Sequence, residues 1–132
     1  MRPNRFLPLV VGLVAATGLA CSSSSTEPTT QQGDVSIVAG ASTLGGNAFA
    51  PNPFTESFAT KASVKWVNRD QSNNGYGGTT GVTHHLVSNT GIFDSGAIGA
   101  GGSYTFTFAS AGSYPYHCSI HPTMTGTITI TP

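Results

Sequence analysis

The sequence predicts an all-β protein with two packed sheets. From residue 34 onward, short runs of alternating apolar and polar residues are separated by Gly, Ser, Asn and Pro, as in strands joined by turns. Charged residues make up only 8% of the chain, and few stretches have the Glu, Lys, Ala and Leu content that favours helices. Each apolar strand face needs an apolar partner, and a β-sandwich provides it.

The first 20 residues differ from the rest of the chain. Arg2 and Arg5 precede an apolar run that ends in small residues at Ala20, which predicts a secretory signal over residues 1–20. The segment resembles a bacterial lipoprotein signal, in which cleavage leaves Cys21 lipidated. The alternative is plain cleavage after Ala20, which would give a soluble periplasmic or secreted protein. Residues 21–33 have no hydrophobic periodicity and are expected to form a flexible tether.

A single domain is expected over residues 34–132. Pro51 and Pro53 restrict the second strand to an edge or a bend, and the third strand is expected to continue that edge. Val64 and Trp66 share one face of the fourth strand, which ends at a turn over residues 68–70. The expected strands are Val35–Val38, Ala48–Ala50, Phe54–Phe58, Ser63–Val67, Val82–Ser88, Tyr104–Phe108, Ser113–Cys118 and Gly126–Thr131.

Charge and cysteine content limit the functions that the chain can have. Five Lys and Arg residues balance five Asp and Glu residues without clustering, which argues against nucleic-acid binding. If Cys21 carries lipid, Cys118 is the only thiol in an oxidising compartment, where a bound metal would protect it. The rival, a Cys21–Cys118 disulfide, would tie a low-complexity tether to the end of a strand.

The motif Cys118-x-x-His121-x-x-Met124 places three donors on one short turn after a strand. A thiolate, an imidazole and a weak thioether are the donor set of a copper electron-transfer site, provided that a second imidazole joins them. His84 and His85 both offer that imidazole, and strand alternation does not choose between them. Zinc fits less well, because structural zinc usually takes paired Cys-x-x-Cys elements.

From about residue 64 onward the chain resembles the cupredoxins, the small blue-copper proteins such as plastocyanin, amicyanin and pseudoazurin. The resemblance is carried by "VKWVNRD", "HHLVS", "IFDSGAIGAGGSYTFTF" and "GSYPYHCSIHPTMTGTITI". It implies an antiparallel Greek-key β-sandwich with one copper ion. An immunoglobulin-like domain is disfavoured, because its disulfide form needs a Cys shortly before the Trp.

The resemblance also assigns residues. Cys118 matches the thiolate ligand, His121 the imidazole that typically reaches the surface, and Met124 the weak axial ligand. Counting back without gaps from Phe93, the remaining imidazole falls on His84. The chain departs from the family pattern at two places, because His85 stands where Asn or Thr is common and residues 71–83 form an insertion. The Gly- and Asn-rich insertion is expected to be a mobile surface loop near the copper.

These features predict a one-electron carrier rather than an enzyme. The expected protein is a monomer on the periplasmic side of a bacterial membrane, contacts the membrane only through its lipid anchor and exchanges electrons with redox partner proteins. The alternative is a copper-binding protein for delivery, storage or sensing. His117 is expected to be structural, because strand alternation points it away from the face that carries Cys118.

Overall fold

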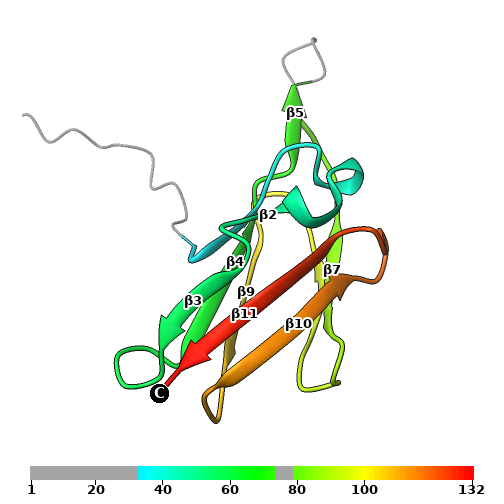
Figure 1. Ribbon diagram of the computed structural model, residues 1–132. Coiled ribbons are helices and arrows are strands. Elements are labelled where there is room, and N and C mark those ends of the chain that lie inside the picture. Colours follow the sequence, from blue (N-terminus) through cyan, green and yellow to red (C-terminus); the bar gives the residue numbers. More distant parts are fainter. Residues whose placement is uncertain (1–32, 74–78) are drawn as a thin grey trace, which may run out of the picture.

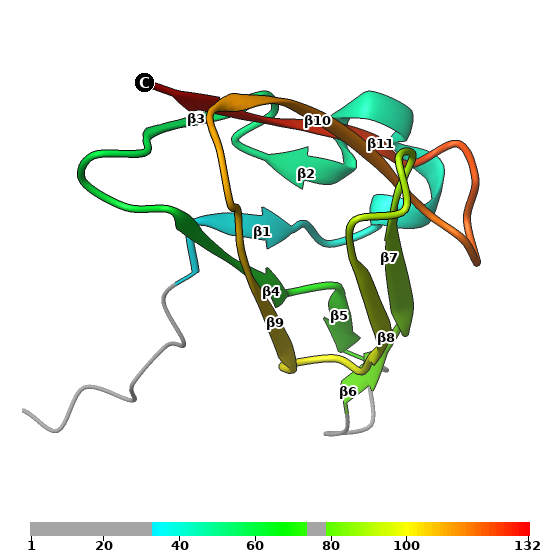
Figure 2. The same cartoon turned by 90° about the horizontal axis from the view of Figure 1, so that it is seen from below.

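The computed structural model describes residues 33–73 and 79–132, which form two facing β-sheets and a separate two-stranded hairpin (Figures 1 and 2). Helical structure in the described residues is limited to the 3-10 turns η1 (Ala41–Thr43) and η2 (Gly45–Ala48). The strands are β1 (Val35–Ile37), β2 (Phe49–Ala50), β3 (Phe54–Ser57), β4 (Ser63–Asn68), β5 (Gln71–Asn73), β6 (Thr79–Gly81), β7 (His84–Ser88), β8 (Asp94–Ile98), β9 (Ser103–Thr107), β10 (Gly112–Cys118) and β11 (Thr125–Thr131).

The expected all-β sandwich is confirmed. One sheet has the order β2-β1-β4-β9 and the other has the order β3-β11-β10-β7-β8. Most neighbouring strands are antiparallel, but β1 pairs with β4 and β3 pairs with β11 in parallel. The sheets are therefore mixed, which the strand patterns alone did not reveal.

The third expected strand belongs to a different sheet from the one we predicted. β2 lies at the edge of the four-stranded sheet, whereas β3 lies at the edge of the five-stranded sheet beside β11. The chain crosses between the sheets in the three residues from Pro51 to Pro53. The two prolines therefore mark a change of sheet rather than a bend within one edge strand.

Aromatic and branched side chains form the core between the two sheets. Trp66 from β4 is fully buried, and its ring lies 5.4 Å from the ring of Phe93 and 5.6 Å from that of Tyr116. Alternate residues of β11, Ile128 and Ile130, face the same core. The strand patterns predicted these inward faces because side chains alternate along a strand.

Where the structure describes it, the insertion before β7 forms a hairpin stem rather than an irregular loop. β5 and β6 pair in antiparallel fashion, with Gln71 opposite Gly81. The stem extends from the end of the sandwich at which β7 begins (Figure 1). Residues 74–78 of the insertion, which we expected to belong to a mobile loop, lie outside the described residues.

The predicted signal and most of the tether, residues 1–32, also lie outside the described residues. Within residues 33–73 and 79–132, the structure contains no helix that is long and apolar enough to cross a membrane.

Candidate metal centre

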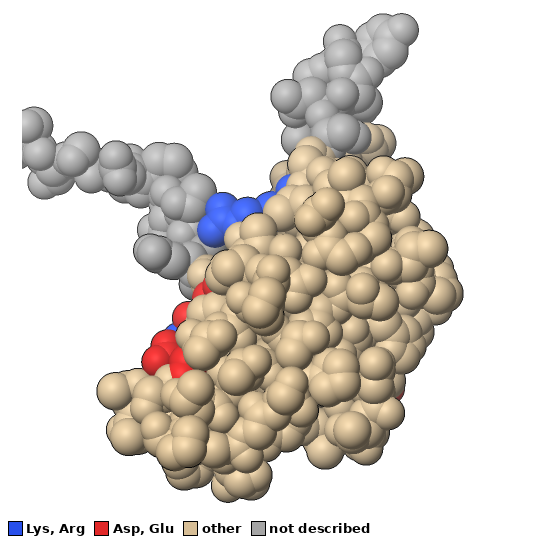
Figure 3. All heavy atoms as spheres, viewed as in Figure 1, with Lys and Arg blue, Asp and Glu red and all other residues tan. Residues whose placement is uncertain are grey.

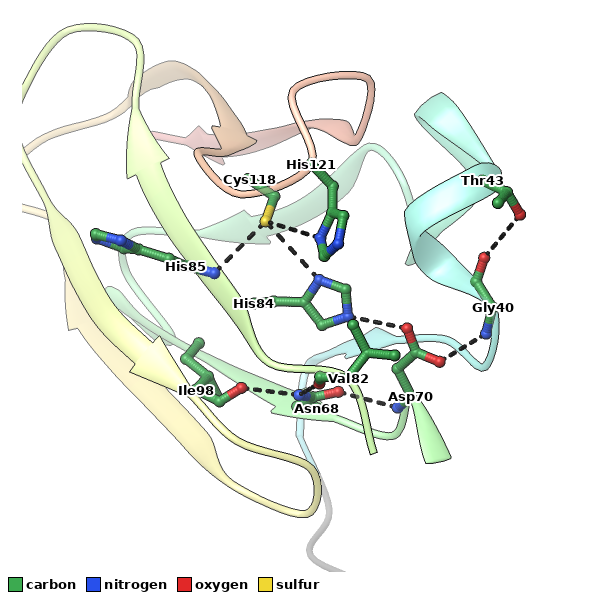
Figure 4. A network of polar contacts seen from close by, with 10 residues as sticks. All are labelled: Gly40, Thr43, Asn68, Asp70, Val82, His84, His85, Ile98, Cys118 and His121. Carbon is green, nitrogen blue, oxygen red and sulfur yellow. Dashed lines mark hydrogen bonds and ion pairs between the residues drawn. The ribbon is translucent and has the colours of Figure 1, made fainter. Parts of the chain in front are cut away.

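Three of the four predicted donors meet at one end of the sandwich. His84 opens β7, Cys118 ends β10, and His121 lies in the turn that follows β10. The Cys118 Sγ atom is 3.8 Å from His84 Nδ1 and 3.7 Å from His121 Nδ1 (Figure 4). All three donor atoms lie within 4.8 Å of one another. The structure therefore brings together residues that are far apart in the sequence.

The strand register explains why the thiol and the first imidazole meet. β7 and β10 are antiparallel neighbours, and Cys118 lies opposite Leu86, two residues after His84. Side chains two residues apart on a strand share a face, so His84 and Cys118 both point into the sandwich. Both residues are fully buried.

The turn after Cys118, which we call the ligand loop (residues 119–124), is closed by backbone hydrogen bonds. The Cys118 N–H donates to the Met124 carbonyl at 3.0 Å, and the Met124 N–H donates to the His121 carbonyl at 2.9 Å. Met124 is fully buried and belongs to the core, whereas His121 is partly exposed. These bonds fix the spacing of Cys118, His121 and Met124 on one compact turn.

The two adjacent histidines have different surroundings. The His84 ring faces Cys118, while the ring of His85 points to the outer face and pairs with Asp94. The main chain of His85 nevertheless contributes to the site, because its N–H donates to Cys118 Sγ at 3.5 Å. The sequence left this role of His85 undefined, because a backbone donor carries no residue-type signal.

His117 lies away from the site, as strand alternation predicted. Its Nδ1 atom is 2.6 Å from Asn89 Oδ1 at the surface. The neighbouring residues His117 and Cys118 thus occupy opposite faces of β10.

The spacing of the donors fits a metal ion. Typical zinc bonds are about 2.3 Å long to thiolate sulfur and about 2.0 Å to imidazole nitrogen. With a sulfur–metal–nitrogen angle of about 120°, such bonds place the sulfur and the nitrogen about 3.7 Å apart. The observed separations of 3.7 and 3.8 Å match this value. A Cys and two His in a trigonal arrangement with a Met nearby is the donor set of electron-transfer copper sites.

A polar network that the sequence did not predict supports the buried histidine. Asp70 Oδ2 lies 2.9 Å from His84 Nε2, and the neighbouring Asn68 is fully buried. Burial lowers the pKa of His84, and the contact with Asp70 opposes this shift. The neutral imidazole that burial favours is also the form that binds metal. Asn68 and Asp70 belong to the predicted turn over residues 68–70, and nothing in the sequence distinguishes them from ordinary turn residues.

Over residues 33–73 and 79–132, fold and site together define a β-sandwich protein with one candidate metal centre built from Cys and His. The sequence matches the family model described as copper binding proteins, plastocyanin/azurin family, over residues 39–131. The chain belongs to this family. The cofactor is copper, and the site accommodates one ion.

Solved structures with the same fold include a purple cupredoxin from Nitrosopumilus maritimus. It is 23% identical to this chain with a TM-score of 0.60, and the match covers 76% of this chain and 100% of that protein. A copper-containing nitrite reductase from Thermus scotoductus SA-01 is 28% identical with a TM-score of 0.50, and the match covers 64% of this chain but only 20% of the reductase. A search of curated proteins finds no significant match.

Proposed function

We propose that the protein is a one-electron carrier in which His84, Cys118, His121 and Met124 hold a single copper ion. The observation that carries this proposal is the buried thiol with two imidazole nitrogens already placed at 3.7 and 3.8 Å from it. Bound copper supplies one-electron cycling between Cu(II) and Cu(I). The residues supply a donor set of the kind that supports such cycling.

Rigid placement of the donors supports electron transfer over copper release. Three of the four residues, His84, Cys118 and Met124, are fully buried. The ligand loop is closed by its own backbone bonds, and β7 and β10 hold the other side of the site. Donors that are preorganised in this way move little when the metal charge changes, which keeps the barrier to electron exchange low.

His121 is the expected exit for the electron because it is the partly exposed member of the set. The ligand loop contains no charged residue, and its Ile120 is 50% exposed. Leu44, 41% exposed, precedes Gly45, whose position borders the Thr123 carbonyl of the loop. In Figure 3 the charged atoms gather mainly on the left of the molecule, and the side that carries the orange and red ligand loop in Figure 1 is almost entirely uncharged. A redox partner protein would dock here through apolar contact.

The proposed role is that of a carrier rather than an enzyme. Residues 33–73 and 79–132 contain one cluster of three or more His, Cys, Asp and Glu residues that could bind a metal, and this cluster is the site described above. The chain spans one fifth of the nitrite reductase that it matches. The proposal therefore assigns the chain the copper site alone, without a substrate position.

The protein is proposed to act from the periplasmic face of a bacterial membrane, as a monomer tethered by lipid on Cys21. The sequence of the signal supports this location, and so does the polar composition of residues 22–32. Cells grown with labelled palmitate should label the protein, whereas the Cys21→Ser variant should stay unlabelled. Equal labelling of both would contradict the anchor.

Repeated redox cycling tests the function. The copper-loaded protein should be reduced and reoxidised many times without losing metal to a competing chelator. Retention of copper with fast, reversible cycling supports the carrier. Transfer of copper to the chelator in the reduced state would instead indicate copper delivery or storage, because a delivery protein must release its cargo.

A further inference from the structure

Behind the buried imidazole lies a buried carboxylate that the donor set does not require. Asp70 is 4% exposed, and its Oδ2 atom lies 2.9 Å from Nε2 of His84 on the ring edge opposite to Cys118 (Figure 4). We propose that Asp70 is an anionic positioning residue that orients His84 and selectively stabilises Cu(II), so that it lowers the reduction potential. This inference rests on the proposed function.

The carboxylate is held from two sides. Oδ1 accepts a 2.7 Å hydrogen bond from the Gly40 N–H, and Oδ2 faces His84. Gly40 has a φ of 74°, a left-handed conformation that favours glycine, and it directly precedes η1. Both oxygens are therefore engaged as hydrogen-bond acceptors, as expected of a carboxylate in a buried position.

The His84 tautomer follows from this arrangement. Nδ1 faces Cys118 Sγ at 3.8 Å, so a metal bound at the site takes the lone pair of Nδ1. The ring hydrogen then resides on Nε2 and is donated to Asp70. Such a bond from a ligand histidine to a carboxylate fixes the ring orientation and raises the basicity of the ligand nitrogen.

The backbone around Asp70 is anchored independently of its carboxylate. The Asp70 N–H donates to Asn68 Oδ1 at 2.9 Å, and the Asp70 carbonyl accepts from the Val82 N–H at 3.0 Å. Asn68 Nδ2 also donates to the Val82 carbonyl at 2.7 Å and to the Ile98 carbonyl at 2.8 Å. Replacing the charge of Asp70 should therefore leave the segment that leads into β7 in place.

Burial makes this charge effective. A negative charge attracts Cu(II) more strongly than Cu(I), and the attraction grows as the effective dielectric falls. Asp94 provides the comparison, because it pairs with His85 but its side chain is 64% exposed and is screened by water and salt. The same change of charge at the two positions should have unequal effects on the potential.

The test compares Asp70→Asn with Asp94→Asn by voltammetry of the copper-loaded protein. Asp70→Asn should raise the reduction potential by at least the equivalent of a tenfold fall in the ratio of Cu(II) to Cu(I) affinity, about 59 mV for one electron. Asp94→Asn should produce less than half of that shift. An unchanged potential in Asp70→Asn, or equal shifts in both variants, would overturn the proposal.

Two further measurements separate charge from packing. Asp70→Glu keeps the negative charge. Its reduction potential should therefore shift less from that of the unaltered protein than the reduction potential of Asp70→Asn. A structural role alone would lower the affinities for Cu(I) and Cu(II) equally, and chelator competition would show this as parallel losses. That outcome would refute the proposal.

The unaltered protein provides a test that does not depend on a variant folding. In the Cu(I) form, proton NMR should show a slowly exchanging, downfield His84 Nε2–H. Rapid exchange of that proton would contradict the bond to Asp70. If this inference fails, Asp70→Asn will cycle reversibly at the potential of the unaltered protein. If the proposed function fails, the unaltered protein itself will show no reversible cycling.

Discussion

Two histidines that are adjacent in the sequence each pair with an aspartate, but in opposite environments. His84 and Asp70 are buried, with 0% and 6% of their side chains exposed, while the side chains of His85 and Asp94 are 31% and 64% exposed. Strand alternation alone separates the two pairs, because successive side chains of β7 point to opposite faces. Residue type therefore does not distinguish the pair that we propose to serve the metal; burial and the position of Cys118 do.

Removing each imidazole should give the largest contrast between the two pairs. His84→Ala should weaken copper binding by more than about 100-fold, since loss of a supporting partner alone costs about 10- to 100-fold. His85→Ala keeps the backbone N–H that reaches Cys118, so its copper affinity should stay close to that of the unaltered protein. Competition with a chromophoric chelator measures both variants. Equal losses would mean that the two rings share the role of ligand.

Breaking the support beneath the buried pair should have the next largest effect. Asn68 is fully buried, and Asn68→Ala removes the donors of the Val82 and Ile98 carbonyls and the acceptor of the Asp70 N–H. The free energy of unfolding should fall by about 3 kcal/mol, because buried polar groups would lose their partners.

The matched control for Asn68→Ala is Asn89→Ala, which removes an exposed partner of His117. Its free energy of unfolding should change by no more than about 0.5 kcal/mol. Urea unfolding of the metal-free protein measures both variants. Similar losses would show that the buried network adds no more stability than a surface contact.

The smallest expected effect is on the titration of the exposed pair. The Gly96 N–H lowers the pKa of Asp94, and the hydrogen bond to His85 lowers it further. Because the pKa of Asp94 is lower in the folded protein than in the unfolded chain, Asp94 stabilises the fold at pH values above its unfolded pKa. This stabilisation is lost as the pH falls through the pKa of Asp94 in the folded protein. In His85→Ala the pKa of Asp94 should rise only part of the way to its ordinary value, because the bond from Gly96 remains. Carbon-detected NMR titration measures it, and a complete return would show that His85 is the main cause.

The sequence predicted the sandwich and the donors better than it predicted their supports. Strand alternation and turn residues sufficed for β4, β9, β10 and β11, and the Cys-x-x-His-x-x-Met spacing indicated three of the four proposed donors. The choice of His84 over His85 came from the resemblance to the cupredoxins, and the structure places His84 beside Cys118. Local sequence patterns indicate which face of a strand a residue occupies, so the strands and the proposed donors could be predicted from the sequence.

The features that the sequence did not show depend on contacts between distant segments. Asp70 meets Gly40 across 30 residues of chain, and no periodic pattern records such a contact. The move of β3 to the second sheet depends on its parallel pairing with β11, at the other end of the domain. The stem of the insertion was missed for a different reason: β5 and β6 are close in the sequence and pair although their residues are of the types common in loops.

The visible and EPR spectrum of the copper-loaded, oxidised protein tests the central claim most directly. A thiolate in the trigonal set of Cys118, His84 and His121 should give an intense visible charge-transfer band. The Cys118→Ser variant should lack this band while it keeps the β-sandwich circular dichroism spectrum. A fully loaded, oxidised sample of the unaltered protein that is colourless and has the EPR spectrum of copper without a thiolate ligand would contradict the account.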